Sequence, residues 1–195
     1  MPESVDKHWI GAEELLEDSL ELARRVLESG YAPTLVIGLW RGGAPVAIAL
    51  HEALRFCGLR VDHLPLRTAL YTGIDQRAPT VRIDGLEALH EHAHADARML
   101  LVDDVFDTGI TMQQVLGTLE QFPGERRIAA LWWKPTRNLT ALRPDYCVHR
   151  SERWLVFPHE LCGLDEAEIS RHKPAACVAT LLAMRALAAA RRGSG

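Results

Sequence analysis

The densest group of residues that could do chemistry is the stretch MLLVDDVFDTGITM, residues 99–112. Asp103 and Asp104 end an apolar run, and two adjacent carboxylates suit ribose hydroxyls or the water shell of a hard cation such as Mg²⁺. The following DTGIT lies directly before a predicted helix, where backbone N–H groups can converge on a phosphate and Gly109 lets the backbone approach it closely. The sequence therefore predicts an anion-binding loop formed by Thr108, Gly109, Ile110 and Thr111.

A second candidate loop lies upstream in VIGLWRGGAPVA, residues 36–47. Arg41 supplies a positive charge, and Gly42 and Gly43 expose backbone N–H groups to an anion. Each motif alone has a plainer interpretation, since RGG can be a turn with a surface arginine and DTG can cap a helix in any α/β protein. The two motifs together favour the anion-binding interpretation.

The segment LLVDDVFDTGIT resembles the signature of the type I phosphoribosyltransferase family, which binds phosphoribosyl diphosphate (PRPP), and it meets that pattern at every position. The resemblance implies that residues 107–111 wrap the 5′-phosphate, and that Asp103 and Asp104 face the ribose hydroxyls and the metal-bearing side of PRPP. It also suggests Asp107 as the residue near the purine imidazole that handles a proton. These three aspartates are therefore the expected catalytic residues, with Mg²⁺ as the expected cofactor.

The upstream segment resembles the diphosphate loop of the same family, which implies that Trp40, Arg41 and Gly42 bind diphosphate. In the family, the peptide before the basic position often has an unusual geometry. That peptide would be the one between Trp40 and Arg41 here.

The segment ALWWKPTRNLTALRPDYCVHRSERWLVFPHEL, residues 130–161, resembles the 6-oxopurine branch of the family. Lys134 matches the lysine that donates to the exocyclic 6-oxygen, and a charged donor there would select an oxo group over an amino group. Trp154 matches the aromatic residue that stacks on the purine, and the main chain of Leu155 and Val156 would address the base edge. The alternatives are an ordinary strand-end lysine and an edge strand that places Trp154 and Val156 in the core.

Two other positions match the family less closely. Glu160 falls where related enzymes carry an acid near a second magnesium, but the local sequence differs. The segment YTGIDQRAPTVRI, residues 71–83, departs from the flexible hood loop of the purine enzymes, where a Ser-Tyr pair is usual. Tyr71 and Thr72 are the residues that could stand in for that pair.

The surrounding sequence predicts strands and helices that alternate, as in an α/β protein. Apolar runs predict buried strands at residues 34–39, 60–66, 98–105 and 126–133, and periodic apolar residues predict helices at 12–29, 46–56, 111–122 and near the C-terminus. Residues 67–97 lack sustained periodicity, apart from a weak helical patch at 85–95, and indicate a long functional loop. Both candidate loops follow predicted strands, at the edge where ligands of parallel sheets bind.

The expected fold is thus type I phosphoribosyltransferase-like, with a central, largely parallel sheet flanked by helices and a small hood region. We expect one domain over residues 1–195, with a core at about 30–135. The hood would comprise the N-terminal segment and about residues 136–165, and a C-terminal helix would span about 175–192.

Composition excludes several classes of protein. The 195 residues carry a net charge of −4, which argues against nucleic-acid binding, and no apolar run approaches the length of a membrane span. The first residues are acidic and polar rather than signal-like, so we expect a cytoplasmic protein with reduced cysteines rather than a disulfide frame or metal site. P-loop, dinucleotide and zinc-peptidase motifs are absent, and His90, His92 and His94 are interpreted as a solvated edge rather than as metal ligands.

The leading hypothesis is transfer of the phosphoribosyl group of PRPP to a 6-oxopurine base, namely hypoxanthine, guanine or xanthine, in purine salvage. Two alternatives stay open: a phosphoribosyltransferase for another nitrogen base, and a regulatory protein that uses the same fold to sense PRPP or nucleotides. The expected partners are PRPP, a purine base and further copies of the chain, as a dimer or tetramer.

Overall fold

The computed structural model describes residues 6–71 and 80–192, which belong to two compact units. The larger one, here called the sheet unit, comprises Glu13–Glu152. The smaller one, here called the terminal unit, comprises Met1–Ala12 with Arg153–Gly195. Tyr71 keeps a described backbone, whereas Thr72 lies outside the described residues.

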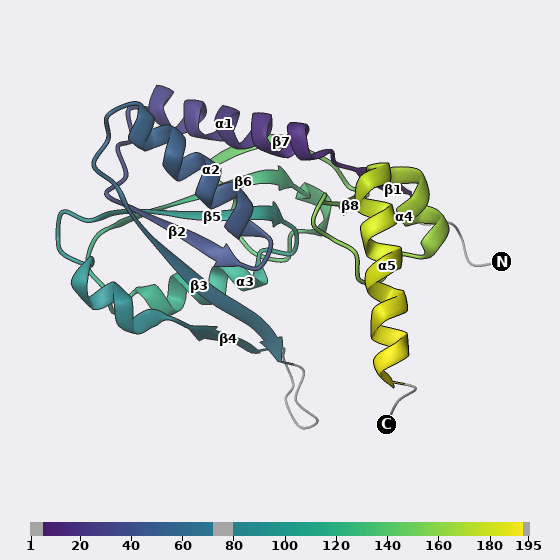
Figure 1. Cartoon of the computed structure of the whole chain (residues 1–195). Coiled ribbons are helices and arrows are strands. Elements are labelled where there is room, and N and C mark those ends of the chain that lie inside the picture. Colours follow the sequence, from purple (N-terminus) through teal and green to yellow (C-terminus); the bar gives the residue numbers. More distant parts are fainter. Residues whose placement is uncertain (1–5, 72–79, 193–195) are drawn as a thin grey trace. The chain divides into compact units, whose positions relative to one another are not determined.

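The sheet unit is built on a six-stranded sheet with the order β4-β3-β2-β5-β6-β7 (Figure 1). All neighbouring strands are parallel except β3 and β4, which confirms the predicted α/β fold with a largely parallel sheet. The strands are β2 (Leu35–Trp40), β3 (Asp62–Tyr71), β4 (Thr80–Asp84), β5 (Arg98–Phe106), β6 (Glu125–Trp133) and β7 (Tyr146–Arg150).

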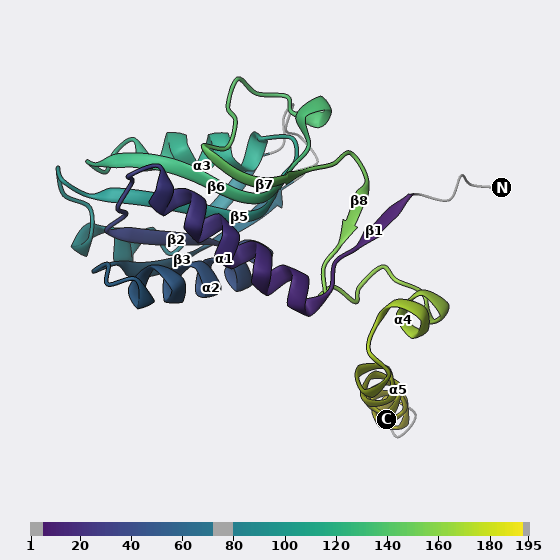
Figure 2. The same cartoon turned by 90° about the horizontal axis from the view of Figure 1, so that it is seen from above.

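Helices cover both faces of this sheet (Figure 2). Helices α1 (Ala12–Glu28) and α2 (Gly43–Phe56) lie on one face, and α3 (Ile110–Leu119) lies on the other, together with the 3-10 turn η1 (Leu86–Glu91). Because β2 is buried on both faces, its residues form one continuous apolar run rather than an alternating pattern. The core on the α3 face includes Leu35, Ile37, Met99, Leu101, Met112 and Val115.

The helix predicted at residues 12–29 is confirmed as α1, whose buried face comprises Ser19, Leu22, Ala23 and Val26. This face follows the three- and four-residue spacing of an amphipathic helix. Gly30 follows the helix with a φ of 79°, a left-handed conformation that suits glycine at a helix end.

The prediction of a long loop at residues 67–97 is wrong for much of that segment. Strand β3 continues to Tyr71 and pairs antiparallel with β4, in a register that places Arg67 opposite Asp84. The Arg67 Nη1 atom lies 2.8 Å from Asp84 Oδ2. The short edge strand has no strong apolar alternation of its own, so its pairing depends on β3, and the local sequence did not reveal it.

The terminal unit combines the N-terminal strand with the segment that begins at Arg153. Strand β1 (Lys7–Trp9) pairs parallel with β8 (Trp154–Val156), and helices α4 (Glu166–His172) and α5 (Ala175–Arg192) follow. A capping box between Asp165 and Glu168 begins α4. The Trp9 ring stacks on the His172 ring with centroids 4.0 Å apart. These contacts tie the N-terminal strand to α4.

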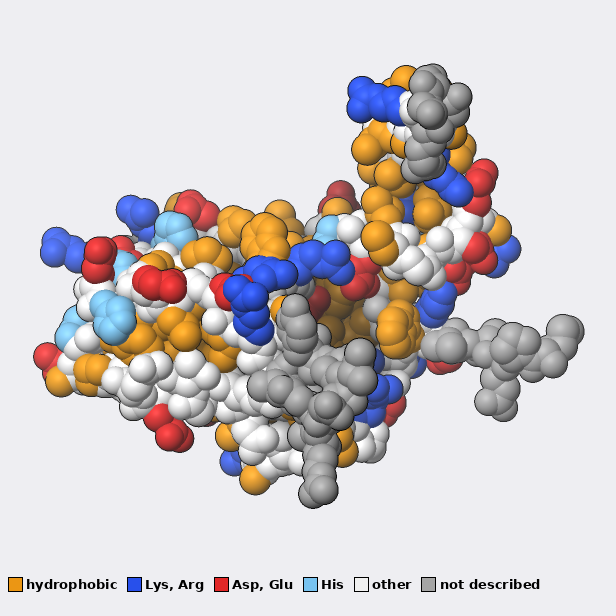
Figure 3. Space-filling model, turned by 90° about the horizontal axis from the view of Figure 1, so that it is seen from below, with side chains coloured by type: hydrophobic (Ala, Val, Ile, Leu, Met, Phe, Trp, Pro, Cys, Tyr) orange, Lys and Arg blue, Asp and Glu red, His pale blue; other side chains and the backbone are white. Residues whose placement is uncertain are grey.

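Helix α5 has an apolar and largely exposed surface, on which hydrophobic side chains predominate (Figure 3). Leu187, for example, is 67% exposed. Among the described residues, no helix is both long and apolar enough to cross a membrane. The predicted single domain with a hood stays a prediction.

Candidate active site

The two predicted anion loops meet at the carboxyl ends of β2 and β5. These strands are parallel neighbours, with Gly38 paired to Val102, so the loops that follow them lie side by side. A Cβ atom at Gly43 would collide with the carbonyl oxygen of Val102 and would lie 2.8 Å from the Cα of Asp103. A Cβ atom at Gly42 would overlap the carboxylate of Asp104. The RGG loop and the acid pair therefore form one site.

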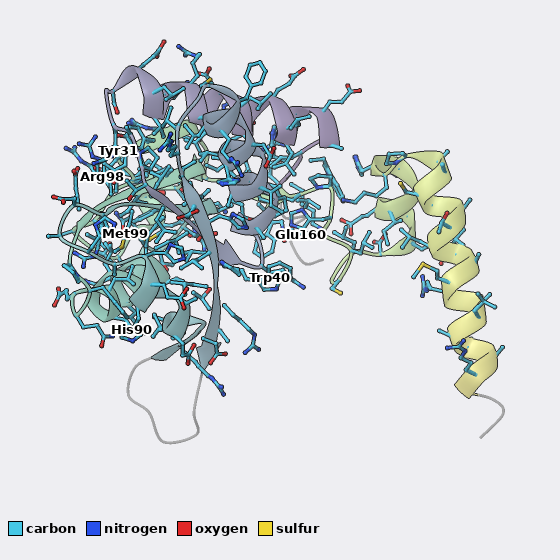
Figure 4. The ribbon with its side chains drawn as sticks, turned by 60° about the vertical axis from the view of Figure 1, so that its left-hand side comes forward. Tyr31, Trp40, His90, Arg98, Met99 and Glu160 are labelled. Atoms are coloured by element: carbon cyan, nitrogen blue, oxygen red, sulfur yellow. The ribbon has the colours of Figure 1, made fainter. Side chains whose placement is uncertain are left out.

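The peptide between Trp40 and Arg41 is cis, in agreement with the unusual geometry implied by the family resemblance. Trp40 ends β2 and is 50% exposed, and α2 begins only three residues later at Gly43. The Tyr31 hydroxyl donates to the Met99 carbonyl at 3.1 Å, at the opposite end of the sheet. Figure 4 shows that Trp40 lies far from both of these residues. The N-terminus of α2 and the Arg41 side chain are thus available to an anion at this edge.

Asp103 and Asp104 directly follow the buried run Met99–Val102 of β5. The Asp104 N–H donates to Asp103 Oδ1 at 3.0 Å, and the Val105 N–H donates to Asp104 Oδ1 at 2.8 Å. Burial raises the pKa of Asp103 well above its usual range, and the neighbouring Asp104 carboxylate raises it further. A cation beside this pair would oppose both effects, because it would stabilise the ionised carboxylates.

The donor chemistry of this pair fits Mg²⁺, which prefers hard oxygen ligands. Among residues 6–71 and 80–192, no cluster of three His, Cys, Asp or Glu side chains is suited to hold a metal by itself. Asp103 and Asp104 would therefore supply part of the coordination sphere, while phosphate and water oxygens would supply the rest.

The loop of residues 107–111 forms the N-terminal end of α3. Gly109 has a φ of 77°, and a Cβ atom there would lie 2.5 Å from Thr140 Oγ1 and 2.7 Å from Asn138 Oδ1. The first hydrogen bond of the helix runs from the Gln113 N–H to the Gly109 carbonyl at 2.9 Å. Among the preceding amides, the Ile110 N–H makes only a long bond of 3.4 Å to Thr108 Oγ1, so the turn can offer main-chain donors to an anion. A cavity of about 70 Å³ lies here, lined by Asp103, Val105, Phe106, Asp107, Thr108, Gly109, Thr111 and Met112.

Lys134 extends from the end of β6 toward the same loop. Its side chain is nearly fully buried, and its Nζ atom lies 3.6 Å from Asp107 Oδ2. The Lys134 N–H donates to the Phe106 carbonyl at 3.0 Å. Lys134 is thus a buried lysine at the end of a strand, and its role toward a base stays a prediction.

Sequence reasoning missed Arg137, which also binds Asp107. Its Nε atom donates to Asp107 Oδ1 at 2.6 Å. Arg137 ends the 3-10 turn η2 (Pro135–Arg137), in which the Arg137 N–H donates to the Lys134 carbonyl at 3.2 Å. In the sequence, only the spacing of Lys134 and Arg137 around a proline indicated that both cations could contact the same carboxylate, that of Asp107.

Asn138 and Thr140 are further residues of the site that the sequence did not indicate. The Asn138 Nδ2 atom donates to the Leu142 carbonyl at 2.7 Å, and the Thr140 N–H donates to Asn138 Oδ1 at 3.0 Å. These bonds hold the two side chains against Gly109. They explain why the loop of residues 107–111 has no room for a larger residue at position 109.

The remaining predicted site residues belong to the terminal unit. Trp154 is 54% exposed, whereas Leu155 and Val156 are buried. The alternative placed both Trp154 and Val156 in the core, and it is wrong for Trp154 but right for Val156. Glu160 Oε2 accepts the Phe157 N–H at 3.1 Å. Both Trp154 and Glu160 line a cavity of about 260 Å³, together with Lys7, Val156, Cys162, Gly163 and Leu164. Their roles toward a base and a metal stay predictions.

His90 and His92 have partners outside the acid pair and its loops. The His90 ring packs against Phe122 with centroids 5.0 Å apart, and His92 Nδ1 lies 3.4 Å from Asp62 Oδ2. Figure 4 shows His90 well away from Trp40. All four cysteines are free thiols. The possible substitutes for the family's Ser-Tyr pair cannot be placed, because Thr72 and the Tyr71 side chain lie outside the described part of the chain.

Comparison with known proteins agrees with this geometry. The family model described as phosphoribosyl transferase domain matches residues 11–166, and the chain therefore belongs to the phosphoribosyltransferase family of enzymes. The chain is 27% identical over 180 residues to a hypoxanthine-guanine phosphoribosyltransferase of Lactococcus lactis, across 89% of this chain and 91% of that protein.

Two solved structures have a similar fold. A purine phosphoribosyltransferase from Pyrococcus horikoshii superposes with a TM-score of 0.67 at 30% identity, covering 82% of this chain and 98% of that one. A hypothetical protein from Neisseria gonorrhoeae with bound ppGpp superposes with a TM-score of 0.71 at 20% identity, covering 84% and 94%. The second likeness concerns the fold alone.

Proposed function

We propose that this enzyme transfers the 5-phosphoribosyl group of PRPP to a 6-oxopurine, forming a nucleoside monophosphate and diphosphate in purine salvage. The observation that carries the choice of base is the pair of Lys134 and Asp107, whose Nζ and Oδ2 atoms lie 3.6 Å apart, with the Lys134 side chain buried and the Asp107 side chain 34% exposed. The purine names of its relatives from L. lactis and P. horikoshii support the same choice.

A 6-oxopurine carries its 6-oxygen and its N7 atom on one edge, where a single group can address both. The Lys134 ammonium would donate to the 6-oxygen, and Asp107 Oδ2 would face N7. An amino-purine would instead place N–H donors against the ammonium, leaving a buried donor without an acceptor. This arrangement therefore favours hypoxanthine, guanine and xanthine over adenine.

The proposed reaction balances as a single displacement. In the N7–H tautomer of the base, the N9 lone pair forms the bond to C1′ while the bond between C1′ and diphosphate oxygen breaks. Diphosphate leaves with that electron pair, and the N7 proton passes to Asp107. Loosening of the C1′ bond before attack would give the sugar oxocarbenium character, as in glycosyl transfer elsewhere.

The rest of the site would hold PRPP. Residues 107–111 would bind the 5′-phosphate, and Trp40, Arg41 and Gly42 would bind the diphosphate through main-chain N–H groups and the guanidinium. Asp103 and Asp104 would bind the ribose hydroxyls and magnesium. Bound magnesium would neutralise charge on the departing diphosphate. Alignment of the two reactants by these loops would supply a further large share of the acceleration.

Other elements of the proposal depend on the family resemblance. Trp154 would stack on the base, the main chain of Leu155 and Val156 would address its edge, and Glu160 would contribute to a second magnesium site. We further propose that the enzyme works in the cytoplasm as a homodimer or tetramer.

The test is diphosphate release from PRPP and Mg²⁺ with hypoxanthine, guanine, xanthine, adenine, uracil and orotate in parallel. The Asp107→Asn variant, purified in the same way, controls for contaminating activity. Turnover confined to the oxopurines supports the proposal, and turnover only with another base contradicts it. Lack of turnover with every base would favour the alternative of a sensor protein.

A further inference from the structure

We propose that Arg137 is a positioning residue that holds Asp107 Oδ1, so that Oδ2 is the oxygen that receives the N7 proton of the base. This inference rests on the proposed function and adds to it a residue and an atom assignment. It arises from the unequal surroundings of the two oxygens of one carboxylate.

Asp107 Oδ1 lies 2.6 Å from Arg137 Nε, within a short charge-assisted hydrogen bond. Asp107 Oδ2 lies 3.6 Å from Lys134 Nζ, which is too long for a hydrogen bond but close enough for charge attraction. Oδ1 therefore accepts a hydrogen bond from Arg137, whereas Oδ2 lies near the Lys134 ammonium without a hydrogen bond to it. A base edge that approaches Lys134 would meet Oδ2.

The backbone keeps Arg137 in register with Asp107. The Lys134 N–H donates to the Phe106 carbonyl at 3.0 Å, and the Leu139 N–H donates to the Thr108 carbonyl at 2.9 Å. Along the sequence, Asp107 lies between the two acceptor residues Phe106 and Thr108. Likewise, Arg137 lies between the two donor residues Lys134 and Leu139. Pro135 restricts the intervening 3-10 turn. The arginine thus approaches the carboxylate from a segment that is anchored on both sides of it.

This arrangement has a chemical consequence. The final torsion of an aspartate side chain is broad and nearly two-fold, so a carboxylate without a fixed partner samples many orientations. The Arg137 bond would select one of them before the base arrives, and a guanidinium does not itself lose a proton. Oδ1 would keep its bond to Arg137 while Oδ2 takes the proton from N7. Preorganisation of this kind affects turnover more than ground-state binding.

The test is a double-mutant cycle with Arg137→Gln, Asp107→Asn and the double variant, using the oxopurine that the wild type prefers. We expect Arg137→Gln to lower kcat about 10-fold to 100-fold, the range that corresponds to loss of one charge-assisted hydrogen bond. The base KM and the calorimetric Kd for PRPP should each change by less than about three-fold, because binding energy shared by ground state and transition state is retained. In the Asp107→Asn background, the same substitution should have little further effect on kcat.

Two controls make the result specific. Arg143→Gln removes an exposed arginine from the same loop and should leave kcat, KM and the melting temperature unchanged. Arg137→Lys keeps the charge but loses the planar donor, and should recover only part of the lost kcat.

Additive effects on kcat in the cycle, or an Arg137→Gln variant that loses PRPP affinity while keeping kcat, would overturn the assignment. If the wild type turned over only a base other than an oxopurine, the proposed function would be refuted. The same double-mutant cycle, measured with that base, would still test whether Arg137 positions Asp107. The two failures are therefore distinguishable.

Discussion

Gly43 and Asp103 pack so closely that a methyl group on the first would lie 2.8 Å from the Cα of the second. The contact is mainly with backbone, because the same methyl group would also collide with the Val102 carbonyl, whereas the nearest side-chain atom, Asp103 Oδ1, would lie 3.2 Å away. It fixes the distance between the RGG loop and the acid pair. A change at position 43 should therefore affect both stability and PRPP binding.

We expect Gly43→Ala to destabilise the protein by about 1–3 kcal/mol, the range for overpacking a tight contact, and to weaken PRPP binding. Denaturant unfolding and calorimetric titration with PRPP and Mg²⁺ would measure the two effects. Gly117→Ala is the matched control: Gly117 lies in α3 with open space around it, so alanine there should stabilise by up to about 1 kcal/mol. Equal behaviour of the two variants would contradict the close packing.

A second prediction concerns the phosphate loop. Gly109 and Gly30 have nearly the same backbone conformation, with φ values of 77° and 79°, but only Gly109 has neighbours in the way of a side chain. Both alanine variants should lose about 1–2 kcal/mol of stability from left-handed strain. Gly109→Ala should lose more, because Asn138 and Thr140 must move, and it alone should weaken binding of PRPP. If Gly30→Ala weakened PRPP binding equally, the loop assignment would be incorrect.

A third prediction tests the choice of base through Lys134. Lys134→Met removes the donor to the 6-oxygen and should lower kcat/KM for oxopurines by about 100-fold or more, since a site built to pair with a polar group discriminates strongly. The Kd for PRPP should change little. Steady-state kinetics with guanine and adenine would show a reduced preference for guanine. An unchanged ratio of the two kcat/KM values would mean that Lys134 does not read the base.

A fourth prediction concerns magnesium. Removal of Mg²⁺ by a chelator should abolish turnover, and titration with Mg²⁺ should restore it. Asp103→Asn and Asp104→Asn should each raise the Mg²⁺ concentration required for half-maximal rate, because each removes a negative hard-oxygen ligand. Arg143→Gln again provides a control with a change of charge away from the site. Identical Mg²⁺ titrations in the wild type and both aspartate variants would contradict the metal assignment.

From the sequence alone, the order of most strands and helices of the sheet unit could be predicted, although strands β4 and β7 were missed. Most residues of the two candidate anion-binding loops could be predicted as well. These features are local, because an apolar run, a glycine turn and a helix start occupy one continuous segment, as in residues 99–112. Lys134 was also within reach of sequence reasoning, since it follows a buried strand directly.

The contacts between segments that are distant in the sequence could be seen only in the folded chain. The hairpin of β3 and β4 depends on cross-strand pairing, which a weakly patterned edge strand does not reveal. The contact of Gly43 with Asp103 depends on the adjacency of β2 and β5. The hydrogen bond from Arg137 to Asp107 forms because the loop after β6 packs against the loop after β5. Side-chain pairs of this kind are set by packing between distant segments, and local sequence preferences carry no information about them.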